Sequence, residues 1–96
     1  MALKEGSLQS DDRNGSWCVY VLRCRGNYLY IGSTNNLTRR LSEHENGTGS
    51  KFVRSRRPFE VAKVIPCEME REARQLEYRL KRLKRKAKVA LLSLEE

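Results

Sequence analysis

The sequence contains no apolar stretch that approaches the ~20 residues needed to cross a bilayer as a helix. Residues 1–15 also lack the apolar centre of a signal peptide, so we expect a protein that is neither exported nor inserted into a membrane. Aromatic residues make up only 7% of the chain, which limits the size of the core and predicts marginal stability. These absences favour a soluble, cytoplasmic protein.

Cysteine is scarce and irregularly spaced. Cys18, Cys24 and Cys67 are an odd set without a CxxC pair, and each lies in or beside an apolar run. This arrangement predicts reduced thiols that are buried as small hydrophobic side chains, with no disulfide. A zinc site formed by these cysteines and His44 is the alternative, but the spacing matches no usual zinc pattern.

Positive charge is what the chain has in excess, with 20 Lys and Arg against 12 Asp and Glu and a formal net charge of +8. Such a surplus on 96 residues favours a polyanionic partner, with nucleic acid first and an anionic membrane second. The length suits one domain. We expect residues 1–15 to be a disordered leader, because they show no hydrophobic periodicity, and residues 16–94 to form the domain.

A β-hairpin is predicted near the start of this domain. Residues 17–24 (WCVYVLRC) and 28–33 (YLYIGS) are rich in β-branched, aromatic and apolar side chains. The segment Arg25-Gly26-Asn27 between them favours a tight turn.

A third strand is predicted over residues 59–67, where apolar side chains alternate. Phe59, Val61 and Ile65 are expected to share one face of this strand, and Pro66 to end it.

Residues 68–86 contain neither Gly nor Pro and predict one long amphipathic helix. Residues 89–94 form a short apolar tail that we expect to fold back onto the sheet. The apolar positions of the helix recur at steps of three and four, at Ala73, Leu76, Leu80, Leu83 and Ala87. Together the elements predict an α/β (α+β) fold in which a small three-stranded antiparallel sheet is flanked by helices.

A shorter helix is predicted between Asn35 or Asn36, either of which can cap it, and the Gly-Thr-Gly segment 47–49. Arg40 and His44 are four residues apart within it, so they lie on one face and one turn from each other. A cationic group and a proton-carrying group are therefore expected to point together.

Residues 47–58 (GTGSKFVRSRRP) predict a flexible basic loop. Its cations surround Phe52, which fits an arm that grips a nucleic-acid backbone. Contacts of this kind carry no information on base sequence. The predicted nucleic-acid-binding residues are Lys51, Arg54, Arg56 and Arg57.

The order CVY, then YIG, then NNLTRRLSEH resembles the GIY-YIG nuclease superfamily over residues 17–92. The WxVYxLRC opening, the Gly-Thr-Gly loop, the RRP turn and the LExRLKRL helix are most similar to its small single-domain, YhbQ-like group. The resemblance implies a GIY-YIG-like fold and a divalent-metal-dependent endonuclease that uses Mg²⁺ or Mn²⁺. Its substrate would be DNA rather than RNA, including structured or damaged DNA.

The resemblance also implies roles for five residues: Tyr20 and Tyr30 are the tyrosines of the two motifs, Arg40 is the helical arginine, His44 follows one turn later, and Glu77 is the metal-binding glutamate. Phosphodiester hydrolysis builds negative charge on the phosphoryl oxygens, which a planar guanidinium and a metal ion can stabilise. One carboxylate with waters and phosphate is a normal shell for magnesium. Tyr20 or His44 could accept the proton of the attacking water, and the resemblance favours Tyr20; Tyr30 could orient water or phosphate.

Gly32 closes the second motif, where a missing side chain would let the strand approach another element or the substrate; a β-bulge is the structural alternative. The site residues have ordinary interpretations too. Strand tyrosines usually pack, Arg40 and His44 could lie on a solvated face, and Glu77 could pair with a nearby cation on its own helix.

Two positions depart from the family pattern: Cys18 stands at the first glycine of GIY, and no asparagine occurs after Asn46. They keep open a second hypothesis, a non-catalytic nucleic-acid-binding module of the same fold. A third hypothesis is an interaction domain whose basic helix docks an acidic protein or an anionic membrane. We expect a monomer, with a protein partner as one possible source of specificity.

Overall fold

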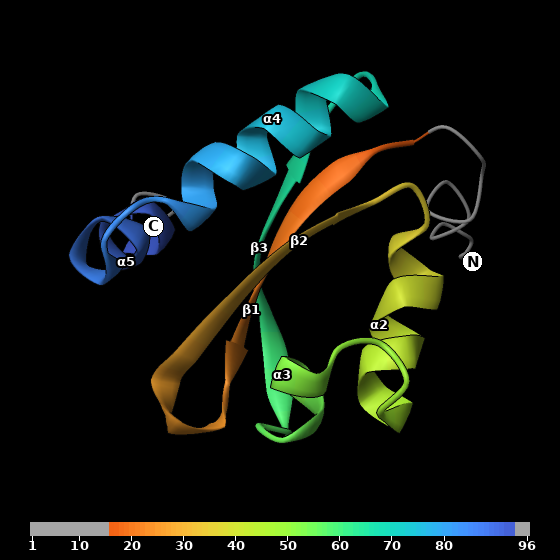
Figure 1. Cartoon of the computed structure of the whole chain (residues 1–96), viewed down its shortest axis with the longest axis vertical. Helices are drawn as coiled ribbons and strands as arrows, with labels where there is room; N and C mark the ends of the chain where they lie inside the picture. The colour runs from red at the N-terminus through yellow and green to blue at the C-terminus, as the bar shows by residue number, and fades with distance from the viewer. Residues whose placement is uncertain (1–15, 94–96) are drawn as a thin grey trace.

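The computed structural model describes residues 16–93, so the predicted leader and Leu94 lie outside it (Figure 1). The three strands form one antiparallel sheet in the order β2-β1-β3, which confirms the predicted α+β fold class. No helix in the described part of the chain is long and apolar enough to span a membrane. The elements are β1 (Cys18–Cys24), η2 (Arg25–Asn27), β2 (Tyr28–Thr34), α2 (Leu37–Asn46), α3 (Lys51–Arg54), β3 (Phe59–Pro66), α4 (Glu70–Lys81) and α5 (Arg85–Ser93).

The predicted hairpin and the shorter predicted helix are both confirmed. Positive φ angles at Gly26 (83°) and Asn27 (64°) reverse the chain between β1 and β2. Asn36 caps α2 by accepting the backbone N–H of Arg39 at 3.0 Å. Gly47, with φ of 89°, adopts the left-handed conformation that ends the helix.

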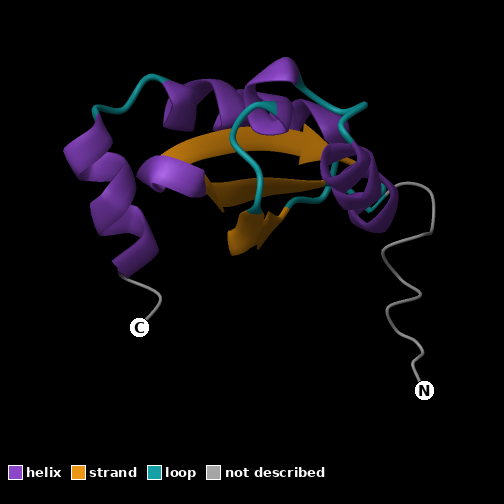
Figure 2. Cartoon of the chain, turned by 90° about the horizontal axis from the view of Figure 1, so that it is seen from below, coloured by secondary structure: helices purple, strands orange, loops and turns teal. Residues whose placement is uncertain are grey.

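Side chains alternate across β1 and divide the interior into two clusters, one on each face of the sheet. On one face, Val19 and Val21 pack with the α4–α5 side of the molecule. On the other, Tyr20 and Leu22 pack with the α2–α3 side, where Val53 is fully buried. Helices α5 and α2 accordingly lie on opposite sides of the sheet in both views (Figures 1 and 2).

The cysteines behave largely as predicted. All three carry thiols rather than a disulfide. Cys18 and Cys24 are 8% and 3% exposed and act as small core residues, whereas Cys67 is only half-buried.

The prediction of one continuous helix over residues 68–86 is wrong, because α4 ends at Lys81 and a second helix, α5, starts at Arg85. The N–H groups of Arg82 and Leu83 donate three residues back rather than four, which tightens the last turn of α4. The reason for the break lies in packing, since Leu80 and Leu92 belong to the same core cluster. In one straight helix they would be ~18 Å apart.

The turn between α4 and α5 also changes which apolar residues are buried. Leu92 is 7% exposed, so the predicted return of the apolar tail to the sheet is confirmed at that residue, whereas Val89 at the start of the tail is 41% exposed. Leu83 and Ala87, which were expected to continue the buried stripe, are exposed.

The prediction that Phe59, Val61 and Ile65 share one face of the third strand is also wrong. A bulge shifts the register of β3 against β1, because Val21 pairs with Lys63 while Leu22 pairs with Val61. Phe59 therefore packs in the α2–α3 cluster, whereas Ile65 packs in the α4–α5 cluster.

The flexible loop predicted at residues 47–58 contains the short helix α3 instead. Ser50 caps this helix by accepting the N–H of Val53 at 3.3 Å, and Val53 anchors it in the core. The N–H of Arg25 in the hairpin donates to the carbonyls of Arg56 and Pro58 at 2.9 and 3.0 Å. The basic segment is therefore fixed against the hairpin and the core.

Candidate active site

A polar cleft of ≈ 230 Å³ wraps around the edge strand β2. Helix α2 contributes to it from one face of the sheet and helix α4 from the other. Of the six predicted catalytic and structural positions, five line this cleft and only His44 does not. The lining residues are Tyr20, Tyr30, Gly32, Ser33, Arg40, Arg74 and Glu77.

Tyr20 reaches the cleft because Gly32, its partner across the β1–β2 ladder, has no side chain. A Cβ atom on Gly32 would lie 2.5 Å from Tyr20 Oη and 2.6 Å from Cζ. The close approach predicted for this glycine is therefore present, and its neighbour is the ring of Tyr20. The phenol is 1% exposed, and burial followed by the nearby Tyr30 raises the pKa of Tyr20, while Arg40 opposes the rise.

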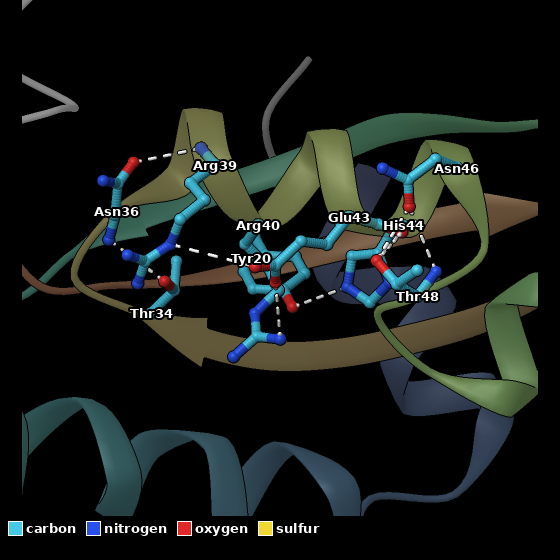
Figure 3. Close-up of polar contacts among 9 residues, drawn as sticks. All are labelled: Tyr20, Thr34, Asn36, Arg39, Arg40, Glu43, His44, Asn46 and Thr48. Atoms are coloured by element: carbon cyan, nitrogen blue, oxygen red, sulfur yellow. Dashed lines mark hydrogen bonds and ion pairs between the residues drawn. The ribbon is translucent and has the colours of Figure 1, made fainter.

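His44 lies behind Tyr20, in contact with its hydroxyl (Figure 3). The ring nitrogen Nε2 is 2.9 Å from Tyr20 Oη, and the imidazole is 1% exposed. The rings of Tyr30 and Phe59 stand at steep angles to the imidazole, with centroids 5.3 and 6.1 Å away. Burial, and then the charge of Arg40, lower the pKa of His44 below its ordinary value, so the ring is neutral at pH 7.

Arg40 enters the cleft from α2, with 39% of its side chain exposed. Glu43, one turn later on the same helix, accepts a hydrogen bond from Arg40 Nη1 at 3.1 Å (Figure 3). This single contact orients the guanidinium but leaves most of its donors available. Arg40 can therefore grip a phosphate in two places at once.

Glu77 faces β2 from helix α4 and is only 20% exposed. Ser33 Oγ donates to Glu77 Oε1 at 2.5 Å, and Lys81 Nζ lies 2.9 Å from Oε2. Burial raises the pKa of the Glu77 carboxyl, but the hydrogen bonds from Ser33 and Lys81 outweigh it and leave the pKa below its ordinary value. The carboxylate is therefore ionised at neutral pH and is held inside the cleft.

This arrangement fits a divalent cation bound through one protein carboxylate. No group of three or more His, Cys, Asp or Glu side chains in residues 16–93 could hold a metal ion. Glu77 has unused lone pairs beyond its two hydrogen bonds, and a hard cation such as Mg²⁺ commonly takes its remaining ligands from water and substrate phosphate.

The predicted nucleic-acid-binding residues lie outside the cleft lining. Lys51 and Arg54 are exposed to solvent. Arg56 stacks instead on Phe52, with its guanidinium carbon 4.0 Å from the ring centroid. Arg57 donates to the carbonyl of Glu45 at 2.8 Å. Half of this set is thus engaged within the protein, and half is available to a partner.

Two cleft residues were missed from the sequence. Ser33 directly follows Gly32, so strand alternation places it on the opposite face, toward α4. Arg74 lies three residues before Glu77 and hence on the same side of α4. The position of Ser33 could have been predicted from the two-residue period of the strand. Arg74 could not have been singled out, because α4 carries many other cationic side chains.

Comparison with known proteins agrees with this geometry. The family model described as the GIY-YIG catalytic domain matches residues 16–90. The chain is 50% identical to a UPF0213 protein of Oceanobacillus iheyensis, over 81% of this chain and 91% of that protein. It is 43% identical to a UPF0213 protein of Clostridium perfringens, over 78% and 81% of the two chains.

A solved structure is also similar. The solution NMR structure of a UPF0213 protein from Bacillus halodurans superposes with a TM-score of 0.57 at 35% identity. The match covers 82% of this chain and 84% of that one.

Proposed function

Because the chain belongs to the GIY-YIG catalytic domain family, we propose that it is a divalent-metal-dependent endonuclease that hydrolyses phosphodiester bonds in DNA. The observation that carries the proposal is one cleft in which the guanidinium of Arg40 and the ionised carboxylate of Glu77 reach the same space from opposite faces of the sheet. Tyr20 lines the same cleft. A phosphodiester needs these three kinds of group when it is hydrolysed.

Arg40 binds the scissile phosphate and stabilises the charge that grows on its oxygens. Glu77 would hold Mg²⁺ or Mn²⁺. When bound, such an ion supplies Lewis-acid stabilisation of the phosphate and makes a bound water easier to deprotonate. Ser33 and Lys81 keep the Glu77 carboxylate turned into the cleft and ionised.

Tyr20 receives the proton of the attacking water as its phenolate, after its own phenolic proton has passed to solvent water in the cleft. Its support over His44 is positional, because Tyr20 lines the cleft and the imidazole lies behind it. Tyr30 also lines the cleft and orients the water or the phosphate. Lys51 and Arg54, both exposed on α3 and outside the cleft lining, contact the DNA backbone away from the cleaved bond.

A cleavage screen tests the proposal. Single-stranded, duplex, flapped and junction DNA would be incubated with the purified chain in Mg²⁺, Mn²⁺ and EDTA. We expect metal-dependent cleavage that falls by at least ~10²-fold in Arg40→Ala and in Glu77→Gln, with unchanged circular dichroism. Glu72→Gln is the matched control, since this carboxylate lies on the same helix but outside the cleft.

Two outcomes would contradict the proposal. Cleavage that persists in both cleft variants would point to a contaminating nuclease. Salt-sensitive DNA binding without cleavage of any substrate would favour the non-catalytic binding module.

A further inference from the structure

His44 is the single histidine of the chain and one of its most buried side chains. Its two ring nitrogens have different surroundings. Nε2 meets Tyr20 Oη at 2.9 Å, whereas Nδ1 is buried with no hydrogen-bond partner among the described residues. The position of the imidazole proton therefore decides which group donates in the contact with Tyr20.

Gly49 closes the space around Nδ1. A Cβ atom on Gly49 would lie 2.6 Å from His44 Nδ1 and 3.1 Å from the His44 backbone nitrogen. The chain is held there because the N–H groups of Thr48 and Gly49 both donate to the carbonyl of Glu43, at 2.9 and 3.0 Å. The backbone of this turn thus occupies the place where an acceptor for an Nδ1 proton would have to lie.

In both neutral tautomers Nδ1 has no hydrogen-bond partner, but the unpaired group differs. A proton on Nδ1 would be a buried N–H donor without an acceptor, which native structures rarely contain. A proton on Nε2 leaves only an unused lone pair on Nδ1, which is the less costly of the two. The second arrangement also gives Nε2–H a good acceptor in Tyr20 Oη.

We infer that His44 carries its proton on Nε2 and donates it to Tyr20 Oη, and that Gly49 fixes the ring in this position. His44 and Gly49 are then positioning residues for Tyr20, and neither touches the substrate. The inference rests on the proposed function only for its catalytic consequence. The hydrogen-bond direction itself is a property of the folded chain.

The consequence concerns the proton of Tyr20. Because one lone pair of Oη accepts from His44, the phenolic hydrogen and the other lone pair are directed toward the cleft. When Tyr20 loses its proton to solvent water in the cleft, the Nε2–H of His44 stabilises the phenolate, and the imidazole takes up no proton itself. The charged groups close to His44 are Arg40 and Glu43, both on its own helix, and they act on its protonation in opposite directions.

The tautomer can be measured directly. A long-range ¹H–¹⁵N correlation spectrum of the labelled full-length chain, purified without a histidine tag, contains one imidazole. We expect a protonated Nε2 and an unprotonated Nδ1 at neutral pH, with a slowly exchanging Nε2–H signal. In Tyr20→Phe that signal should move upfield and exchange faster, because its acceptor is gone. A proton found on Nδ1 would overturn the inference.

Variants at His44 separate a donor from a proton acceptor. A glutamine amide can donate to Tyr20 but cannot take up a proton, and leucine can do neither. We therefore expect His44→Gln to cut DNA at least about tenfold faster than His44→Leu, the effect of one hydrogen bond to a charged group. Equal inactivity of both folded variants would show that His44 accepts a proton.

Gly49→Ala tests the second half of the inference. The added methyl should shift the imidazole signals and speed exchange of Nε2–H while the rest of the spectrum stays folded. Unchanged imidazole signals would overturn the role of Gly49. These spectra need no substrate, so they separate this inference from the proposed function, which fails instead if the wild-type chain cuts no DNA.

Discussion

Replacing Gly32 by alanine places a methyl group where the ring of Tyr20 lies. The new Cβ would be 2.5 Å from Tyr20 Oη and 2.6 Å from Cζ, about 1 Å inside the ~3.5 Å of an ordinary contact. Tyr20 is 1% exposed and bonded to His44, so it cannot move aside without disturbing its neighbours. Overpacking of this kind destabilises a fold by ~1–3 kcal/mol. A shift of ~1 Å in a reacting group lowers the rate by ~10²-fold.

The effect of Gly32→Ala can be assigned to Tyr20 by a double-mutant cycle. Urea unfolding, followed through the single tryptophan, gives stability, and cleavage of a fixed DNA substrate gives rate. Tyr20→Leu removes the atoms that the methyl meets, so in that background Gly32→Ala should cost less than ~0.5 kcal/mol. A Gly32→Ala protein as stable and as active as wild type would refute the close packing of these two residues.

Burial lowers the pKa of His44 below its ordinary value of 6.5. The stability of the fold that depends on a neutral His44 is therefore complete above pH 6.5 and is lost as pH falls below it, through the folded pKa. Urea midpoints should show a decline that His44→Gln flattens, and an identical decline in the variant would contradict it. Lys51→Ala and Arg54→Ala should each lower the slope of log affinity for duplex DNA against log salt by ~0.9, measured by fluorescence anisotropy, and unchanged slopes would place the DNA elsewhere. Leu92→Ala should reduce the free energy of unfolding by ~2–5 kcal/mol, whereas an unchanged urea midpoint would mean that α5 does not pack on the sheet.

Features set by local interactions could be predicted from the sequence. The Arg25-Gly26-Asn27 turn and the Asn36 cap depend on a few neighbouring residues, and both are present. The four-residue spacing of Arg40 and His44 also placed them on one side of α2. Spacing says nothing about depth, however. Arg40 is part-exposed in the cleft while His44 is enclosed, because the ring of Tyr20 covers the histidine.

Features that depend on contacts between residues far apart in the sequence could not be predicted from the sequence. No Gly or Pro marks the end of α4 near Lys81; the helix stops because Leu92 packs back beside Leu80. The bulge near Ala62 likewise follows from the fit of β3 against two different helix layers. Likewise, the approach of Glu77 to Ser33 joins residues 44 apart in sequence, and only the packing of α4 on β2 brings them together.

The cleft wraps around a single edge strand, and this has a consequence for how the protein can lose activity. Tyr20 belongs to one hydrophobic cluster, together with Leu37 and Leu41 of the helix that carries Arg40. Leu76 and Leu80, beside Glu77 on α4, belong to the other cluster. Loosening of α4 and α5 alone would carry the carboxylate away while the arginine, tyrosine and histidine stayed in register. Inactivation on heating should therefore precede global melting.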